Sequence, residues 1–395
     1  MRLANRVDKI KPSATLAISA KAKELKADGH RVFPMAAGEP DFPTPEHIRR
    51  ACFQAMEDGH TGYAPSAGIA RLRQVLRDKA RDELGVEYSD DQVIVGLGAK
   101  HCLYNCMQAV LEPGDGLLLQ APYWVSYPAQ ALLADANPVV LPMPGTEFGL
   151  NHQALANATQ NNLRMMILNS PSNPSGAVLS GEDLDELARI AVEQDMVVVS
   201  DDIYDKLVYE HKPEHILVRH PELADRTVIV NGLSKTYSMT GWRLGWALGP
   251  TEIIMAMRKI QDQSTSNAVT FVQHAAIAAL EGPTEVVVAM RDEFARRRDV
   301  MVQRLNELDG VSCHKPDGAF YAFASFEGVL HKRFDGVEIG STLKLAELML
   351  EHERIAVVPG EAFGASGYLR FSFACSLDTI EEAMEHLKNF LSKIS

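Results

Sequence analysis

The chain has 395 residues, of which 46% are hydrophobic and 23% charged, a composition typical of a globular protein with a sizeable core. Its 39 lysine and arginine residues face 52 aspartate and glutamate residues, and the formal net charge of −13 disfavours nucleic acid and anionic membranes as partners. No apolar run approaches a membrane span of roughly 20 residues or the core of a signal peptide, so we expect a soluble cytoplasmic protein.

The predicted elements begin with an N-terminal arm and a short helix, because Pro40, Pro43 and Pro45 interrupt regular structure in the first 45 or so residues. Further along, short apolar runs alternate with amphipathic stretches such as residues 181–193. This alternation is typical of an α/β fold with a mostly parallel sheet that is covered on both faces. The apolar runs are residues 93–95, 117–119, 165–168, 197–199, 228–230 and 244–248.

From about residue 286 the pattern changes to a long charged helix over residues 291–308, then shorter strand-like pieces and a final helix from Asp378. This order predicts a smaller α+β domain. We therefore expect residues 1–45 to form an arm and part of the small domain, residues 46–285 a large domain, and residues 286–395 the small C-terminal domain. The strand-like pieces are residues 319–324, 355–358 and 368–373.

Polar and glycine-rich segments follow the apolar runs at the point where each run ends, at residues 96–100, 120–124, 169–173, 200–201 and 231–235. In open α/β sheets, ligands bind at the carboxyl ends of the strands, so these segments predict a single site. Residues 96–101 read Gly-Leu-Gly-Ala-Lys-His, a turn opening a helix. Because His101 stands where a dinucleotide-binding loop has its third glycine, we interpret the turn as an anion site instead.

Among the candidate functional residues, Lys235 has the sequence surroundings that point most clearly to a reactive side chain. An isolated lysine is usually a solvated surface group. Here it follows a buried run among small residues, where desolvation lowers the pKa of the amine, as a Schiff-base lysine requires. Arg243, eight positions further on, offers a planar guanidinium for a phosphate.

The segment around Lys235, residues 232–245, resembles the lysine signature of the class I and II pyridoxal-phosphate aminotransferases. Further motifs occur in the order of that family over nearly the whole chain, at residues 36–42, 63–68, 122–128, 169–176 and 369–372. The resemblance implies the PLP-dependent transferase fold of type I. It is nearest to the bacterial aspartate aminotransferases of the aspartate/prephenate subgroup.

The resemblance assigns roles around a pyridoxal 5'-phosphate (PLP) ring. Lys235 would hold the cofactor as a Schiff base, and Asp201 would keep the pyridine nitrogen protonated. Asn173 and Tyr204 would donate hydrogen bonds to the phenolic oxygen, and Trp124 would stack on the ring. Asn173 and Trp124 would also contact the substrate. Taken singly, Asp201 could be a helix cap, Asn173 a turn residue and Trp124 a core residue.

The same resemblance assigns the phosphate and the substrate. Gly98, Ala99 and Arg243 would bind the phosphate together with Tyr63 contributed by a partner subunit. Arg370 would bind the substrate α-carboxylate in a bidentate manner, beside the backbone of Gly38. Lys100 and Thr15 would select the distal carboxylate of a dicarboxylic substrate. Alternatively, Arg370 forms a surface ion pair and Lys100 is a solvated residue at a helix start, where its charge opposes the helix dipole.

We therefore predict transamination between aspartate and 2-oxoglutarate by a ping-pong Schiff-base mechanism, with prephenate as a further candidate substrate, in a homodimer with shared active sites. The alternative is a PLP-dependent β-lyase or cyclising synthase, which would use the same Lys235, Asp201 and Arg370. A PLP-sensing regulator would need a DNA-binding domain ahead of the motifs that begin at Ala36. Five scattered cysteines predict reduced thiols and no metal site.

Overall fold

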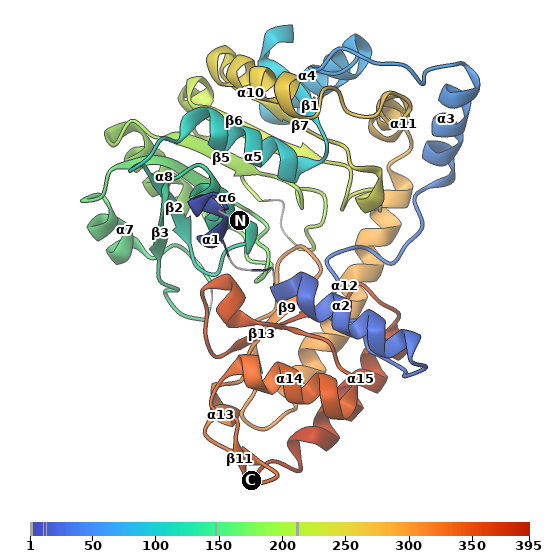
Figure 1. The fold of residues 1–395 in the computed structure, drawn as a ribbon, viewed down its shortest axis with the longest axis vertical. Coiled ribbons are helices and arrows are strands. Elements are labelled where there is room, and N and C mark those ends of the chain that lie inside the picture. Colours follow the sequence, from blue (N-terminus) through green and yellow to red (C-terminus); the bar gives the residue numbers. More distant parts are fainter. Residues whose placement is uncertain (1–2, 11, 13, 147, 211–212) are drawn as a thin grey trace.

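Figure 1 shows a computed structural model, which describes residues 3–10, 12, 14–146, 148–210 and 213–395. A large sheet with its covering helices occupies the upper part of the view. A smaller sheet and the C-terminal helices occupy the lower part, and the long helix α12 (Glu285–Asn306) runs between the two. None of the helices in these residues is long and apolar enough to cross a membrane.

The large sheet has seven strands in the order β1-β7-β6-β5-β4-β2-β3. Only β7 runs antiparallel to its neighbours, so the predicted mostly parallel α/β sheet is confirmed. Strand β3 has no counterpart among the predicted strands, because it is an edge strand whose residues are mostly half-buried or exposed. The strands are β1 (Val93–Gly96), β2 (Gly116–Gln120), β3 (Asn137–Leu141), β4 (Leu163–Leu168), β5 (Val197–Asp201), β6 (Thr227–Gly232) and β7 (Gly245–Leu248).

Both faces of this sheet are buried, which explains why its central strands are continuously apolar. Successive side chains of a strand point to opposite faces, and Val197 and Val199 of β5 pack in one core while Val198 packs in the other. The first core includes side chains of α5 (Ala99–Val110) and α10 (Thr251–Ser264). The second includes side chains of α4 (Ala70–Leu84), α8 (Gly181–Glu193) and α11 (Thr270–Glu281).

The smaller sheet is antiparallel and has the strand order β12-β13-β9-β8. Helices α12, α14 (Thr342–Glu353) and α15 (Leu377–Leu391) pack around it (Figure 1). Helix α12 begins at Glu285 instead of the expected residue 291, because its first turns contain three consecutive valines, which are weak helix formers. The remaining strands are β8 (Ser312–Cys313), β9 (Tyr321–Ser325), β10 (Arg333–Phe334), β11 (Val337–Glu338), β12 (Val358–Pro359) and β13 (Tyr368–Ser372).

The N-terminal segment reaches the smaller sheet. Phe33 forms a parallel bridge with Ile355, and the Phe33 backbone nitrogen donates to the Arg354 carbonyl over 2.9 Å. The segment thereby brings Gly38 close to the end of the large sheet. The other α-helices are α1 (Asn5–Asp8), α2 (Ala14–Ala27), α3 (Glu46–Glu57), α6 (Ser126–Leu133), α7 (His152–Ala158), α9 (Ile216–Arg219) and α13 (Glu327–Leu330). The division into domains at residues 45 and 285 stays a prediction.

Candidate active site

A cavity of about 250 Å³ opens at the carboxyl ends of the large sheet. Asn169 follows β4, Asp201 ends β5 and Lys235 follows β6, so three neighbouring strands deliver polar side chains to one place. Arg370 of β13 and Tyr321 of β9 line the opposite side from the smaller sheet. The position agrees with the general placement of ligand sites in open α/β sheets.

Lys235 lies half-buried in this cavity. Its Nζ donates a hydrogen bond to the Gly38 carbonyl and lies 5.8 Å from the centroid of the Phe320 ring. Burial lowers the pKa of the Lys235 amine to about 8, and the nearby Arg370 cation lowers it further while Glu39 opposes this effect. A substantial fraction of this amine is therefore neutral near neutral pH, as a nucleophile or a proton acceptor must be.

Asp201 is almost fully buried, with 3% of its surface exposed. Burial raises the pKa of its carboxyl to about 7, and a hydrogen bond from Tyr127 opposes this shift. The Tyr127 hydroxyl donates to Oδ2 over 2.7 Å, and the Ile203 backbone nitrogen approaches Oδ1 at 3.4 Å. Oδ1 thus remains able to accept a strong hydrogen bond from a ligand.

Arg370 is also buried, with 2% exposure, and forms no salt bridge among the described residues. Its Nη1 donates to Asn173 Oδ1 and its Nη2 to the Ala36 carbonyl, each over 2.9 Å, while its Nε has no partner in the described chain. The guanidinium lies 4.3 Å from the centroid of the Tyr321 ring. Because a buried cation without an anion is costly, this arrangement suits an anionic ligand.

A second cation lies elsewhere in the cavity. Nζ of Lys100 is 4.7 Å from the centroid of the Trp124 ring. Burial, followed by the charge of Arg243, lowers the pKa of the Lys100 amine. Thr15 Oγ1, which lines the same cavity, is buried without a hydrogen-bond partner in the described part of the chain. Lys100 and Thr15 therefore offer donors to a ligand group.

The start of α5 forms a close cradle with Arg243. Gly98 caps this helix at a φ of 87°, and a Cβ atom there would lie 2.8 Å from Nη2 of Arg243. The Arg243 side chain is held by the Thr240 carbonyl, to which Nη1 donates over 2.8 Å. A guanidinium beside the N-terminus of a helix is a favourable environment for a phosphate.

Most of the predicted site residues meet in this one cavity. Gly98 lies directly before the lining residue Ala99, whereas Tyr63 is 96% exposed and does not line the cavity. The predicted residues that line it are Thr15, Gly38, Ala99, Lys100, Trp124, Asn173, Asp201, Tyr204, Lys235, Arg243 and Arg370.

Sequence reasoning missed Tyr127, Asn169 and Tyr321 as individual lining residues. Asn169 was recognisable as the first polar residue after a buried run. Tyr127 and Tyr321 were not, because an aromatic residue in a helix or strand usually indicates core packing. Among the residues that the structure describes, no group of three or more His, Cys, Asp or Glu side chains could hold a metal ion.

Comparisons with known proteins point to one family. Residues 30–387 match the family described as aminotransferase class I and II. The aspartate aminotransferase of Bacillus subtilis is 43% identical over the full length of both chains. The aspartate/prephenate aminotransferase of Cereibacter sphaeroides is 41% identical and covers 100% of this chain and 99% of its own. The structure of Thermus thermophilus aspartate aminotransferase with maleate matches with a TM-score of 0.92 and 38% identity, over 99% of this chain and 100% of its own.

Proposed function

The chain belongs to the class I and II aminotransferases, and we propose that it transfers the amino group of aspartate to 2-oxoglutarate with pyridoxal phosphate as its cofactor. Two cations, Arg370 and Lys100, support the choice of a dicarboxylic substrate. They line one cavity with Lys235, and neither forms a salt bridge among the residues that the structure describes. Two buried donors of this cavity, Arg370 Nε and Thr15 Oγ1, have no partner in the described chain. Two carboxylates on one substrate would satisfy both.

The residues present fit pyridoxal phosphate. At Gly98 the start of α5 lies directly against the guanidinium of Arg243. The phosphate would therefore contact this guanidinium and the first backbone N–H groups of α5 together. Asp201 would hold the protonated ring nitrogen through Oδ1. Lys235 would bind the aldehyde carbon, since its lowered pKa leaves part of the amine neutral.

When bound, pyridoxal phosphate draws electrons away from the α-carbon of an attached amino acid. After the substrate amine has replaced Lys235 on the aldehyde carbon, Nζ of Lys235 would accept the proton of the α-carbon and deliver it to the former aldehyde carbon. Because Asn173 Oδ1 accepts from Arg370, the Asn173 amide nitrogen is available to donate to the phenolic oxygen of the ring. Tyr204, whose hydroxyl lies 3.1 Å from that of Tyr321, would donate to the same oxygen.

Arg370 would fix the substrate α-carboxylate, and the Lys100–Thr15 pair would bind the distal carboxylate. The structure of the Thermus thermophilus enzyme contains maleate, which is a dicarboxylate. This ligand supports the choice of a dicarboxylic substrate. The name of the Cereibacter sphaeroides relative adds prephenate as a candidate substrate for this chain. A β-lyase with the same Lys235 is not favoured, because the relatives compared are named as aminotransferases.

The test is a panel of amino donors with 2-oxoglutarate as the acceptor. We expect aspartate to be converted with stoichiometric formation of glutamate, and the Lys235→Ala variant to lose at least about a thousandfold in kcat. A β-lyase would instead release the amino group of its substrate as ammonia. Formation of ammonia without glutamate, or full turnover of the Lys235→Ala variant, would contradict the proposed function.

We also propose a homodimer in which Tyr63 of each subunit completes the phosphate site of the other. Two observations support this arrangement. Tyr63 is 96% exposed, which is unusual for a large aromatic side chain, and it lies outside the cavity of its own chain. Phe53 and Met56 of α3 are exposed close to it in the sequence.

A further inference from the structure

Tyr127 occupies a position that the proposed function does not yet use. It belongs to α6, exposes only 2% of its surface and lines the active-site cavity. Its hydroxyl is the only side-chain donor to the Asp201 carboxylate among the described residues, at 2.7 Å. It also packs edge-to-face against Trp124, with ring centroids 5.2 Å apart and an interplanar angle of 79°. One side chain thus contacts two of the predicted neighbours of the cofactor ring, Asp201 and Trp124.

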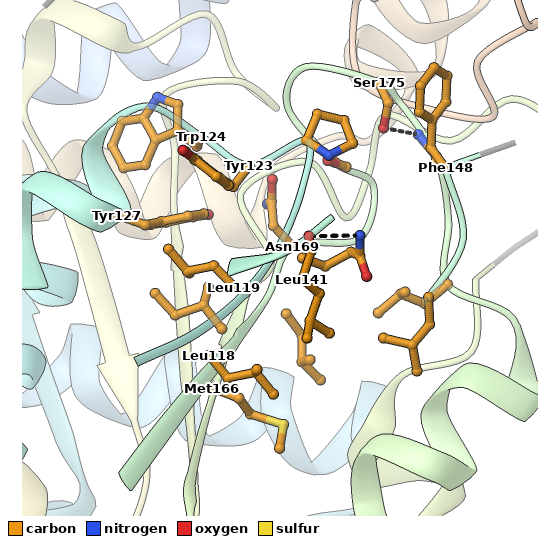
Figure 2. A pocket seen from close by; sticks show the side chains of 18 of the residues that line it. Leu118, Leu119, Tyr123, Trp124, Tyr127, Leu141, Phe148, Met166, Asn169 and Ser175 are labelled. Carbon is orange, nitrogen blue, oxygen red and sulfur yellow. Dashed lines mark hydrogen bonds between the residues drawn. The ribbon is translucent and has the colours of Figure 1, made fainter. Parts of the chain in front are cut away.

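Tyr127 also separates the active site from a second cavity. This apolar cavity of about 60 Å³ is lined mainly by aliphatic side chains, including Leu118, Leu119 and Met166. Figure 2 shows Tyr127 and Trp124 at one wall of it and Phe148 at the opposite wall. A space this small and apolar offers few polar partners for water. No other described side chain donates a hydrogen bond to the Asp201 carboxylate, so removal of the Tyr127 hydroxyl would leave Oδ2 without a side-chain donor.

We propose that Tyr127 is a positioning residue, whose hydroxyl holds Oδ2 of Asp201 so that Oδ1 remains for the ring nitrogen of the cofactor, and whose ring supports Trp124. The inference rests on the proposed function, because it concerns how this chain receives pyridoxal phosphate. Tyr127 would thereby orient the carboxylate of Asp201 and the ring of Trp124.

The charges around Asp201 explain why such a donor is needed. Burial raises the pKa of Asp201, and the neighbouring Asp202 raises it further, while Lys235 on the other side lowers it. Asp202 itself pairs with His215 Nε2 at 3.0 Å. The Tyr127 hydrogen bond stabilises the ionised carboxylate, so it acts against both burial and Asp202.

The experiment compares Tyr127→Phe with Tyr123→Phe. Tyr123 lies in the loop directly before α6 and lines the same apolar cavity, but its hydroxyl has no hydrogen-bond partner in the described chain. The first readout is the titration of Asp201 in the cofactor-free protein, followed through its carboxyl infrared band and identified by its absence in Asp201→Asn. We expect the midpoint to move to higher pH in Tyr127→Phe and to stay unchanged in Tyr123→Phe.

The second readout is the dissociation constant of pyridoxal phosphate. We expect it to rise about 10- to 100-fold in Tyr127→Phe, the usual effect of losing a hydrogen bond to a charged group. In the Asp201→Asn background the same substitution should change the constant much less, because Tyr127 acts through Asp201. Thermal unfolding checks that both single variants fold.

Three results would overturn the inference. One is an unchanged Asp201 titration in Tyr127→Phe, and another is an equal loss of affinity in both tyrosine variants. The third is full additivity of the Tyr127 and Asp201 substitutions. The Asp201 titration tests the role of Tyr127 without pyridoxal phosphate. If the wild-type protein does not bind pyridoxal phosphate, the proposed function is wrong, and the titration still tests the Tyr127–Asp201 contact separately.

Discussion

Burial moves the pKa values of Asp201 and Lys235 toward each other, to about 7 and about 8. In water the carboxylic acid would titrate several units below the amine. In this cavity both groups change charge near neutral pH, so small energetic changes suffice to move a proton to or from them. The same burial means that the cofactor-free site carries two groups whose charged forms are disfavoured.

One consequence is a pH-dependent stability cost at Asp201. Its folded-state pKa of about 7 lies above the ordinary carboxyl value of 3.8. Between these values the folded state binds more protons than the unfolded state, so the free energy of unfolding falls as the pH rises, and the cost is complete above pH 7. We expect cofactor-free Asp201→Asn to melt a few degrees above wild type at pH 8, with a smaller difference at pH 5.

Calorimetry at the two pH values measures this difference. Asp309→Asn is a suitable control, because Asp309 is exposed and forms no salt bridge in the described chain. A melting temperature of Asp201→Asn equal to or below that of wild type at pH 8 would contradict the cost assigned to the buried carboxylate.

Lys100 provides a test of substrate selection. We expect Lys100→Ala to lower kcat/KM for aspartate about 10- to 100-fold, because a partly desolvated ion pair with the distal carboxylate is lost. With alanine as donor, which has no distal carboxylate, the change should stay within about threefold. Steady-state kinetics with both donors gives the ratio, and Lys259→Ala, an exposed lysine on α10, is the matched control. Equal losses for the two donors would assign Lys100 to the support of Trp124 instead.

At the scale of single residues, the sequence allowed prediction of those site residues that directly follow a buried strand. Lys235 and Asp201 follow apolar runs, so their position at the sheet edge could be predicted from periodicity. Tyr321 and Tyr127 could not, because their polar function depends on a hydroxyl that meets Tyr204 or Asp201 only in the folded chain. Arg370 needed the family motif, since a lone arginine in a strand is otherwise a common surface residue.

At the scale of elements, the turn before α5 carries the cofactor phosphate site in our proposal. We expect Gly98→Ala to raise the dissociation constant of pyridoxal phosphate at least about tenfold, because the new Cβ would crowd the guanidinium of Arg243. Gly29→Ala is a close control: Gly29 has a φ of +88°, but a Cβ there would meet no atom within 4 Å. Both variants share the backbone strain, and only the first crowds Arg243.

A titration with pyridoxal phosphate, followed by absorbance, distinguishes these two variants. Comparable losses of affinity in both would show that global destabilisation, and not the cradle, determines cofactor binding. An unaffected Gly98→Ala variant would remove the α5 turn from the phosphate site.

Strands of the large sheet that are buried on both faces have continuous apolar sequences, and these strands were predicted correctly. The prediction failed at the edge of the sheet. Strand β3 pairs with β2 at the edge, so its sequence is not required to be uniformly apolar. Its pairing is set by tertiary contacts that no local pattern contains. The beginning of α12, residues 285–290, was missed for a similar reason, since consecutive valines form a helix there in spite of their low helix propensity.

At the scale of the whole molecule, the site is assembled from three distant parts of the chain. Thr15 and Gly38 come from the N-terminal segment, Lys235 from the large sheet and Arg370 from the smaller sheet. Any movement of the smaller sheet relative to the large one would change the distance between Arg370 and Lys235. If Arg370 binds the α-carboxylate as proposed, substrate binding and the packing of the two sheets would be linked through this contact.

The proposed exchange of Tyr63 between subunits can be tested by mixing two defective variants. Lys235→Ala lacks the reactive amine, and Tyr63→Ala lacks a phosphate ligand that would act on the other subunit. In a mixed dimer, one of the two sites would receive both substitutions and the other would receive neither. After subunit exchange of an equal mixture, about a quarter of all sites should be intact. Activity well above the sum of the separate variants, measured after exchange, is the expected result. If Tyr63 served its own chain, every site would carry one defect and mixing would restore nothing.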